Sequence, residues 1–157
     1  MPSSRESAGR VIALDVGEVR IGVALSDPDR KVALPAGTIV VRGAPQDLKA
    51  VAGLVREHAA TEVVVGHPLS LSGERGPAAH RAEEFAVGLR AVLEVPVHLH
   101  DERLTTVEAN RDLRSAGATG REARRAVDQA AASIILRGYL ERSAGQSADR
   151  RGRGRSP

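Results

Sequence analysis

The stretch Val11-Ile-Ala-Leu-Asp-Val-Gly-Glu-Val-Arg-Ile-Gly-Val-Ala-Leu25 holds two apolar runs separated by a short polar break at Gly17-Glu18. Its β-branched and small residues, bounded by turn formers, predict two paired strands over Val11–Val16 and Val19–Ser26. Asp15 ends the first run, so this hairpin carries a carboxylate where its first strand stops. An acid is rarely buried without a positive partner, so Asp15 is either a turn residue or part of a charged site.

Beyond the hairpin, strand and helix patterns alternate. Further strands are predicted at Gly37–Val41, Glu62–Gly66 and Val95–His100. Apolar residues at helical spacing, a proline in a first turn and two capping-box motifs predict helices over 45–60, 78–93, 105–115 and 119–139. Three strands followed by helix, strand, helix, strand and two helices predict an α/β fold: a five-stranded mixed sheet with helices on both faces.

Length and composition describe one folded domain over residues 1–142. The chain of 157 residues is long enough to bury a single core, and its lack of cysteine excludes disulfides and thiolate metal sites. The first ten residues lack the apolar stretch of a signal peptide, and no apolar run is long enough to span a bilayer. We therefore expect a cytoplasmic protein with no membrane partner.

Residues 143–157 are predicted to form a disordered basic tail, because none of their side chains is apolar and larger than alanine. One acid and four arginines lie there: Asp149, Arg150, Arg151, Arg153 and Arg155. The net charge of the whole chain is +3, which the tail alone supplies, so residues 1–142 are formally neutral. The tail could hold RNA through salt-sensitive contacts, or be a solubilising extension without a specific role.

Two later acids also lie in apolar surroundings. Glu102 follows the predicted strand ending at His100, and Asp128 lies within Ala126-Val-Asp-Gln-Ala-Ala-Ala-Ser-Ile-Ile-Leu136. The residues three and four positions after Asp128 are alanines on the same helical face, so its carboxylate is either partnered or coordinating. If the fold gathers Asp15, Glu102 and Asp128, their missing partner is a divalent metal.

Each of these acids also has a purely structural interpretation. Asp15 could shape a turn, and Glu102 could form a surface ion pair. Strand alternation lets only one of Asp101 and Glu102 face a given side, so position alone does not choose between them. For Asp128, Arg124 lies four residues earlier on the helix and could be an ion-pair partner.

Three clustered carboxylates favour phosphodiester hydrolysis. The attacked phosphorus is shielded by negative oxygens, so a catalyst must neutralise charge and supply a nucleophile, and two Mg²⁺ or Mn²⁺ ions can do both. These hard cations prefer carboxylate oxygens. The histidines give a weaker metal pattern, because His98 and His100 share a strand face without a third zinc ligand at a recognisable spacing.

Four motifs, in this order, resemble the YqgF/RuvX family of pre-16S rRNA nucleases. They are Asp15-Val-Gly-Glu-Val-Arg-Ile-Gly-Val-Ala-Leu-Ser-Asp27, Val65-Gly-His-Pro-Leu-Ser-Leu-Ser-Gly73, Asp101-Glu-Arg-Leu-Thr-Thr106 and Asp128-Gln-Ala-Ala-Ala-Ser-Ile-Ile-Leu136. The resemblance implies an RNase H-like fold, a divalent-metal nuclease and a role in trimming the 5′ end of the small-subunit rRNA precursor. It also implies that Glu102, not Asp101, is the metal-site acid, and it places Arg20, Arg75 and Arg103 in motifs where we expect phosphate contacts.

Other functions remain open at this point. A Holliday junction resolvase-type DNA endonuclease shares the implied fold, and branched DNA would then be the substrate in place of precursor rRNA. A non-catalytic module that binds RNA or a ribosome-assembly partner is another alternative. The Asp-x-Gly hairpin also resembles the phosphate loop of actin-like ATPases and sugar kinases, which bind nucleotide between two such domains. We expect a monomer or weak homodimer.

Overall fold

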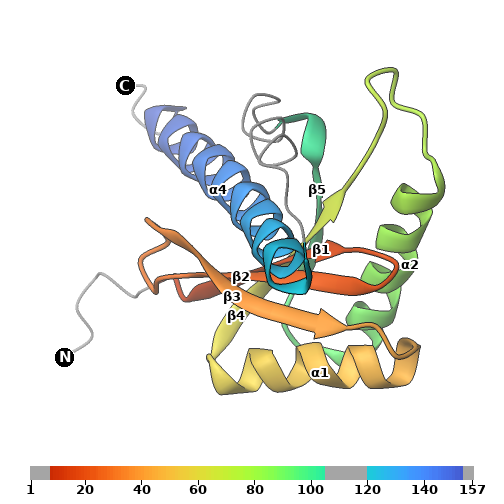
Figure 1. The fold of residues 1–157 in the computed structure, drawn as a ribbon. Coiled ribbons are helices and arrows are strands. Elements are labelled where there is room, and N and C mark those ends of the chain that lie inside the picture. Colours follow the sequence, from red (N-terminus) through yellow and green to blue (C-terminus); the bar gives the residue numbers. More distant parts are fainter. Residues whose placement is uncertain (1–7, 105–119, 154–157) are drawn as a thin grey trace.

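The computed structural model describes residues 8–104 and 120–153, and Figure 1 shows their fold. In chain order the elements are β1 (Arg10–Val16), β2 (Arg20–Ser26), β3 (Ala33–Val40), α1 (Ala44–Glu57), β4 (Ala60–His67), α2 (Pro77–Val92), β5 (Val97–Asp101), the 3₁₀ turn η1 (Glu102–Leu104) and α4 (Arg121–Arg153). No helix among these residues combines the length and apolar character needed to cross a membrane.

The five strands form one mixed sheet, as predicted. Their order is β3-β2-β1-β4-β5, with β1 antiparallel to β2 and parallel to β4. Strand β4 is in turn parallel to β5. The carboxyl ends of β1, β4 and β5 therefore meet at the same edge of the sheet, next to the turn that joins β1 to β2.

Helices cover both faces of the sheet (Figure 1). Helices α1 and α2 pack on one face, and α4 crosses the other. Strand β1 is buried on both sides: Ile12 and Leu14 belong to the core under α1 and α2, and Val11 and Ala13 belong to the core under α4. This double coverage explains why the central strands are continuously apolar instead of alternating.

Strand β3 is longer than predicted. It begins at Ala33 instead of Gly37, because its pairing with β2 continues through a bulge opposite Val23 and Ala24. Within this bulge Gly37 has a φ of 117°, in the region that favours glycine. Pro35 and Gly37 are normally strand-ending signals, which is why the pattern alone predicts the shorter strand.

Helix α4 is also longer than predicted. The composition predicts a helix ending near Tyr139 and a disordered tail after residue 142, but the structure continues the helix to Arg153. Alanine, glutamine and arginine favour helix, and extending a formed helix costs much less than starting one. The helix predicted over 105–115 lies outside the described residues.

Candidate active site

Asp15 lies near the carboxyl end of β1, between two glycines of the neighbouring strands. It is paired with Gly22 of β2. On the other side Leu14 is paired with Val65 of β4, which puts Gly66 next to Asp15. Residues opposite each other in a sheet share a face, and Asp15 lies two residues after Ala13, which packs under α4. Asp15 therefore faces α4, with no side chain on either neighbouring strand beside it.

Each of the two glycines leaves room for a different one of the other candidate acids. A Cβ atom at Gly22 would lie 2.1 Å from the carbonyl oxygen of Asp128 and 3.3 Å from its Cβ. A Cβ atom at Gly66 would lie 2.6 Å from Oε1 of Glu102 and 2.6 Å from Cδ1 of Ile135. The missing side chains let α4 and η1 approach the sheet on either side of Asp15. The fold thus brings the three predicted acids to one end of the sheet, on the α4 face.

Strand alternation separates Glu102 from Asp101. Asp101 is paired with His67, whose Nε2 lies 3.3 Å from Oε1 of Glu83 on α2, so these side chains face away from α4. Arg103 donates to both carboxylate oxygens of Asp101, with Nη2 at 2.6 Å from Oδ2 and Nε at 3.0 Å from Oδ1. These bonds lower the pKa of Asp101 and raise the pKa of Arg103. Arg103 thus pairs with Asp101, and Glu102 Oε1 lies on the α4 side.

Asp128 has an ion-pair partner that its sequence neighbourhood does not indicate. Nε of Arg20, from the start of β2, lies 2.8 Å from Oδ2 of Asp128. The sequence alternative paired Asp128 with Arg124, on its own helix. Because the actual partner is 108 positions away along the chain, only the close approach of α4 to Gly22 brings the two together.

The donor chemistry of this site fits a hard divalent cation, although the acids are not gathered around one point. Carboxylate oxygens are the ligands that Mg²⁺ and Mn²⁺ prefer, and the space beside Gly66 that a Cβ would fill is occupied by a carboxylate oxygen of Glu102. Among the described residues, however, no three His, Asp or Glu side chains are close enough to hold one ion. The carboxylate of Asp128 is turned to Arg20 instead. In the part of the chain that the structure describes, no third metal ligand joins His98 and His100. The structure therefore gives no support to the alternative of a zinc site.

All three arginines predicted to bind phosphate have carboxylate partners. Arg20 binds Asp128 and Arg103 binds Asp101. Nε of Arg75 lies 2.7 Å from Oε1 of Glu83, and this contact lowers the pKa of Glu83. A phosphate bound to any of these arginines would therefore share the guanidinium with a carboxylate or displace that acid.

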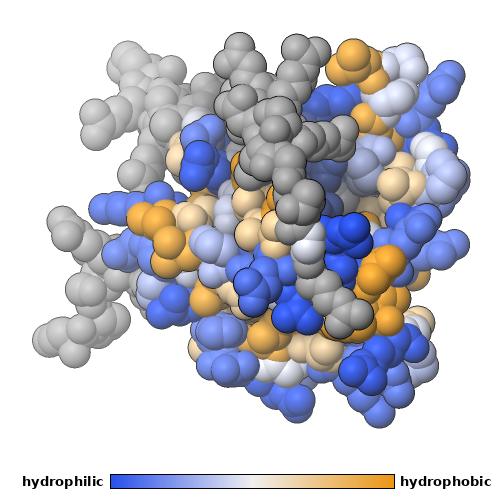
Figure 2. Space-filling model, in the orientation of Figure 1, coloured by the Kyte–Doolittle hydropathy of each residue, from blue (hydrophilic) through white to orange (hydrophobic). Residues whose placement is uncertain are grey.

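An arginine that the sequence analysis did not single out lies beside Arg20. Val19, Arg20, Val40 and Arg125 line a hollow of about 270 Å³ at the hairpin end of the sheet. Arg125 is exposed, and no carboxylate of the described residues lies within ion-pair distance of it. In the face shown in Figure 2, hydrophilic and apolar side chains of the described residues are interspersed. The sequence could have indicated Arg125 through its position three residues before Asp128, which puts the two residues on one helical face.

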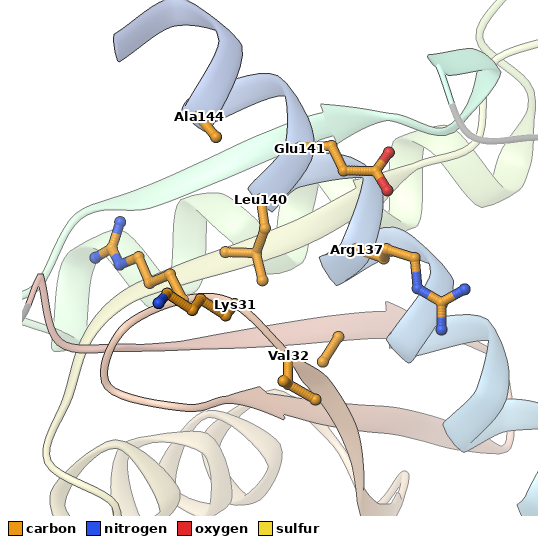
Figure 3. A pocket seen from close by; sticks show the side chains of 8 residues that line it. Lys31, Val32, Arg137, Leu140, Glu141 and Ala144 are labelled. Atoms are coloured by element: carbon orange, nitrogen blue, oxygen red, sulfur yellow. The ribbon is translucent and has the colours of Figure 1, made fainter. Parts of the chain in front are cut away.

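A second hollow, of about 460 Å³, lies at the opposite end of β2, between the β2–β3 turn and the later part of α4 (Figure 3). In Figure 3, Lys31 and Arg137 lie on opposite sides of Leu140. None of the candidate acids lines this hollow. It is therefore separate from the site around Asp15.

The fold defines the chain's class. The structure resembles Thermus thermophilus RuvC in complex with a Holliday junction substrate, with a TM-score of 0.58, 14% identity, and coverage of 87% of this chain and 96% of that one. A second T. thermophilus RuvC structure gives a TM-score of 0.55 at 13% identity, with the same coverage. The chain has an RNase H-like fold, as the motif resemblance implied.

The family follows from the sequence. Residues 9–142 match the model of the RuvX family, described as Holliday junction resolvase, and the chain belongs to that family. A protein of Anaeromyxobacter dehalogenans (strain 2CP-C), named "Putative pre-16S rRNA nuclease", is 44% identical over 86% of this chain and 98% of its own length. A protein of the same name from Rhodococcus erythropolis is 52% identical over 85% of this chain and 78% of its own length. The family and these names make the chain a nuclease, which confirms the predicted enzyme class.

Proposed function

We propose that this chain is a divalent-metal-dependent nuclease that trims the 5′ end of the 16S rRNA precursor. The observation that carries the proposal is the placement of Asp15 between Gly22 and Gly66, with Asp128 and Glu102 entering from either side. The named relatives supply the substrate class. A role in ribosome biogenesis would place the protein in the cytoplasm with precursor rRNA as its partner, and a monomer or weak homodimer stays a prediction.

The acids have distinct roles in this proposal. Asp15, on the central strand, would lie closest to the scissile phosphate, with Glu102 on its β4 side and Asp128 on its β2 side. A divalent ion held by these carboxylates would offset the charge of the phosphate and favour ionisation of the attacking water. Because two of the acids belong to the edge of a rigid sheet and its following turn, they are held in place before substrate binds.

The direct test is cleavage of a precursor 16S rRNA fragment with Mn²⁺ or Mg²⁺. We expect Asp15→Asn to lower the rate at least about a hundredfold, because the variant loses a ligand of the ion that would offset the developing negative charge, and losing one such stabilising interaction costs about 10²–10³ in rate. EDTA should abolish cleavage by the wild-type protein. The matched control is Glu18→Gln, which removes one negative charge from the exposed turn of the same hairpin, where the carboxylate pairs with Arg81 and not with the candidate acids. It should leave the rate within about twofold.

Cleavage by Asp15→Asn at the wild-type rate would refute the role of this acid. A four-way DNA junction belongs in the same assay, because the family description names Holliday junction resolvases. Faster cleavage of the junction than of the RNA would overturn the RNA assignment and support the resolvase alternative. Binding of RNA without cleavage under any metal condition would support the non-catalytic alternative.

A further inference from the structure

We propose that Arg20 and Arg125 form a phosphate-binding site, and that a nucleic-acid phosphate bound there displaces Asp128 from Arg20. Asp128 then becomes available to the divalent ion. This inference rests on the proposed function, and it adds a coupling: the metal site is completed only when the substrate backbone is in place.

The ion pair between Arg20 and Asp128 is accessible enough to exchange partners. The two side chains are 21% and 27% exposed. The contact uses Nε of Arg20. Solvent reaches both side chains of this partly buried pair and screens their attraction, so another anion can compete for the guanidinium.

The hollow beside Arg20 is suited to that competing anion. Arg125 lines it together with Arg20, and two valines, Val19 and Val40, complete its walls. Both valines are exposed, at 62% and 46%. A phosphodiester entering this hollow would meet two guanidinium groups, each able to bind phosphate oxygens with paired N–H donors. Asp128 contacts Arg20 through Nε alone, whereas a phosphate in the hollow could contact Arg20 and Arg125 together and so compete with the acid.

Once released from Arg20, the side chain of Asp128 can turn towards Asp15. A Cβ at Gly22 would lie 3.3 Å from the Cβ of Asp128, and Gly22 is the strand partner of Asp15. The backbone of Asp128 is therefore already beside Asp15, and rotation of its side chain is enough to change its partner. In the described residues the three acids do not form a metal-binding group, so Asp128 has to leave Arg20 before it can join one.

The first test is binding of a single-stranded RNA oligonucleotide in EDTA at low salt. We expect Asp128→Asn to bind the RNA about fivefold more tightly than the wild-type protein, because it frees Arg20. Glu94→Gln removes an equal negative charge at an exposed position that forms no ion pair with another described residue, and should change the affinity less than about twofold. In the double variant Arg20→Gln/Asp128→Asn the gain should disappear.

The second test is the affinity for Mn²⁺ without RNA. Arg20→Gln should raise this affinity about fivefold, since an exposed ion pair contributes up to about 1 kcal/mol. Arg125→Gln removes an equal positive charge nearby and should raise it less than about twofold. Equal effects of Arg20→Gln and Arg125→Gln, or a gain in RNA affinity that persists without Arg20, would overturn the exchange. Failure of every variant to bind RNA would refute the proposed function as well, whereas equal gains with RNA binding intact refute the exchange alone.

Discussion

Gly66 links the backbone of β4 to the position of Glu102. A Cβ there would approach both Oε1 of Glu102 and Cδ1 of Ile135 to 2.6 Å. Both atoms are ends of flexible side chains, so they can move, but Glu102 would move away from Asp15. The absence of a side chain at Gly66 is therefore what allows Glu102 to take its position in the site.

Gly66→Ala tests this link. We expect cleavage to fall at least tenfold, and the free energy of unfolding to fall by about 1–2 kcal/mol because the core under α4 is overpacked. The cleavage assay and urea unfolding measure the two effects. The control is Gly53→Ala on α1, where nothing lies within 4 Å of the new Cβ, and which should stabilise the protein by about 0.5–1 kcal/mol. Full activity in Gly66→Ala would show that the position of Glu102 does not matter.

At the scale of elements, α4 has two parts with different surroundings. Its apolar residues Ala132, Ile135, Leu136 and Leu140 pack on the sheet. The sequence after Arg142 contains four arginines and no large apolar residue. The first part therefore belongs to the core, and the basic sequence of the last part suits contacts with a polyanion.

Deletion of residues 143–157 tests the role of the last part of α4 without changing the part that packs on the sheet. We expect the urea midpoint to stay unchanged, because the packed residues of α4 are retained. RNA binding should become less dependent on salt, with a slope of log affinity against log salt shallower by up to about 3, since each phosphate contact to a single strand contributes about 0.7. Titrations between about 50 and 200 mM salt measure the slope. An unchanged slope would mean that the tail does not contact RNA.

The elements show where sequence patterns succeed. The hairpin of β1 and β2 is where its apolar runs predict it, because local alternation and turn residues determine it. The start of β3 is not predictable in the same way, since a bulge lets the strand continue past Pro35 and Gly37. The end of α4 is missed because composition does not show that a helix, once formed on the core, extends into polar sequence.

At the scale of the whole molecule, the candidate site combines residues that are far apart in the chain. The sequence singles out the three acids because Asp15 and Glu102 come at the ends of strand patterns and Asp128 lies within an apolar helical stretch, and their role in the site stays a prediction. The pairing of Arg20 with Asp128 is not predictable, because it depends on the packing of α4 against Gly22. The partners of Arg75 and Arg103 are likewise set by tertiary contacts.

The formal neutrality of residues 1–142 limits how strongly the folded part of the chain can attract nucleic acid. The folded body has no overall basic excess, so general attraction to nucleic acid is weak outside the tail. Specific arginines must therefore supply the phosphate contacts, and Arg20 with Arg125 is the pair that the structure places beside the acids.

The central claim is that Asp15, Glu102 and Asp128 hold a divalent ion. The most direct measurement is the anomalous difference density of crystals grown with Mn²⁺ and an uncleaved RNA strand. We expect a peak bound by Asp15 and Glu102, with Asp128 turned from Arg20 towards it. An RNA strand bound at the site with no peak beside Asp15, at saturating Mn²⁺, would contradict it.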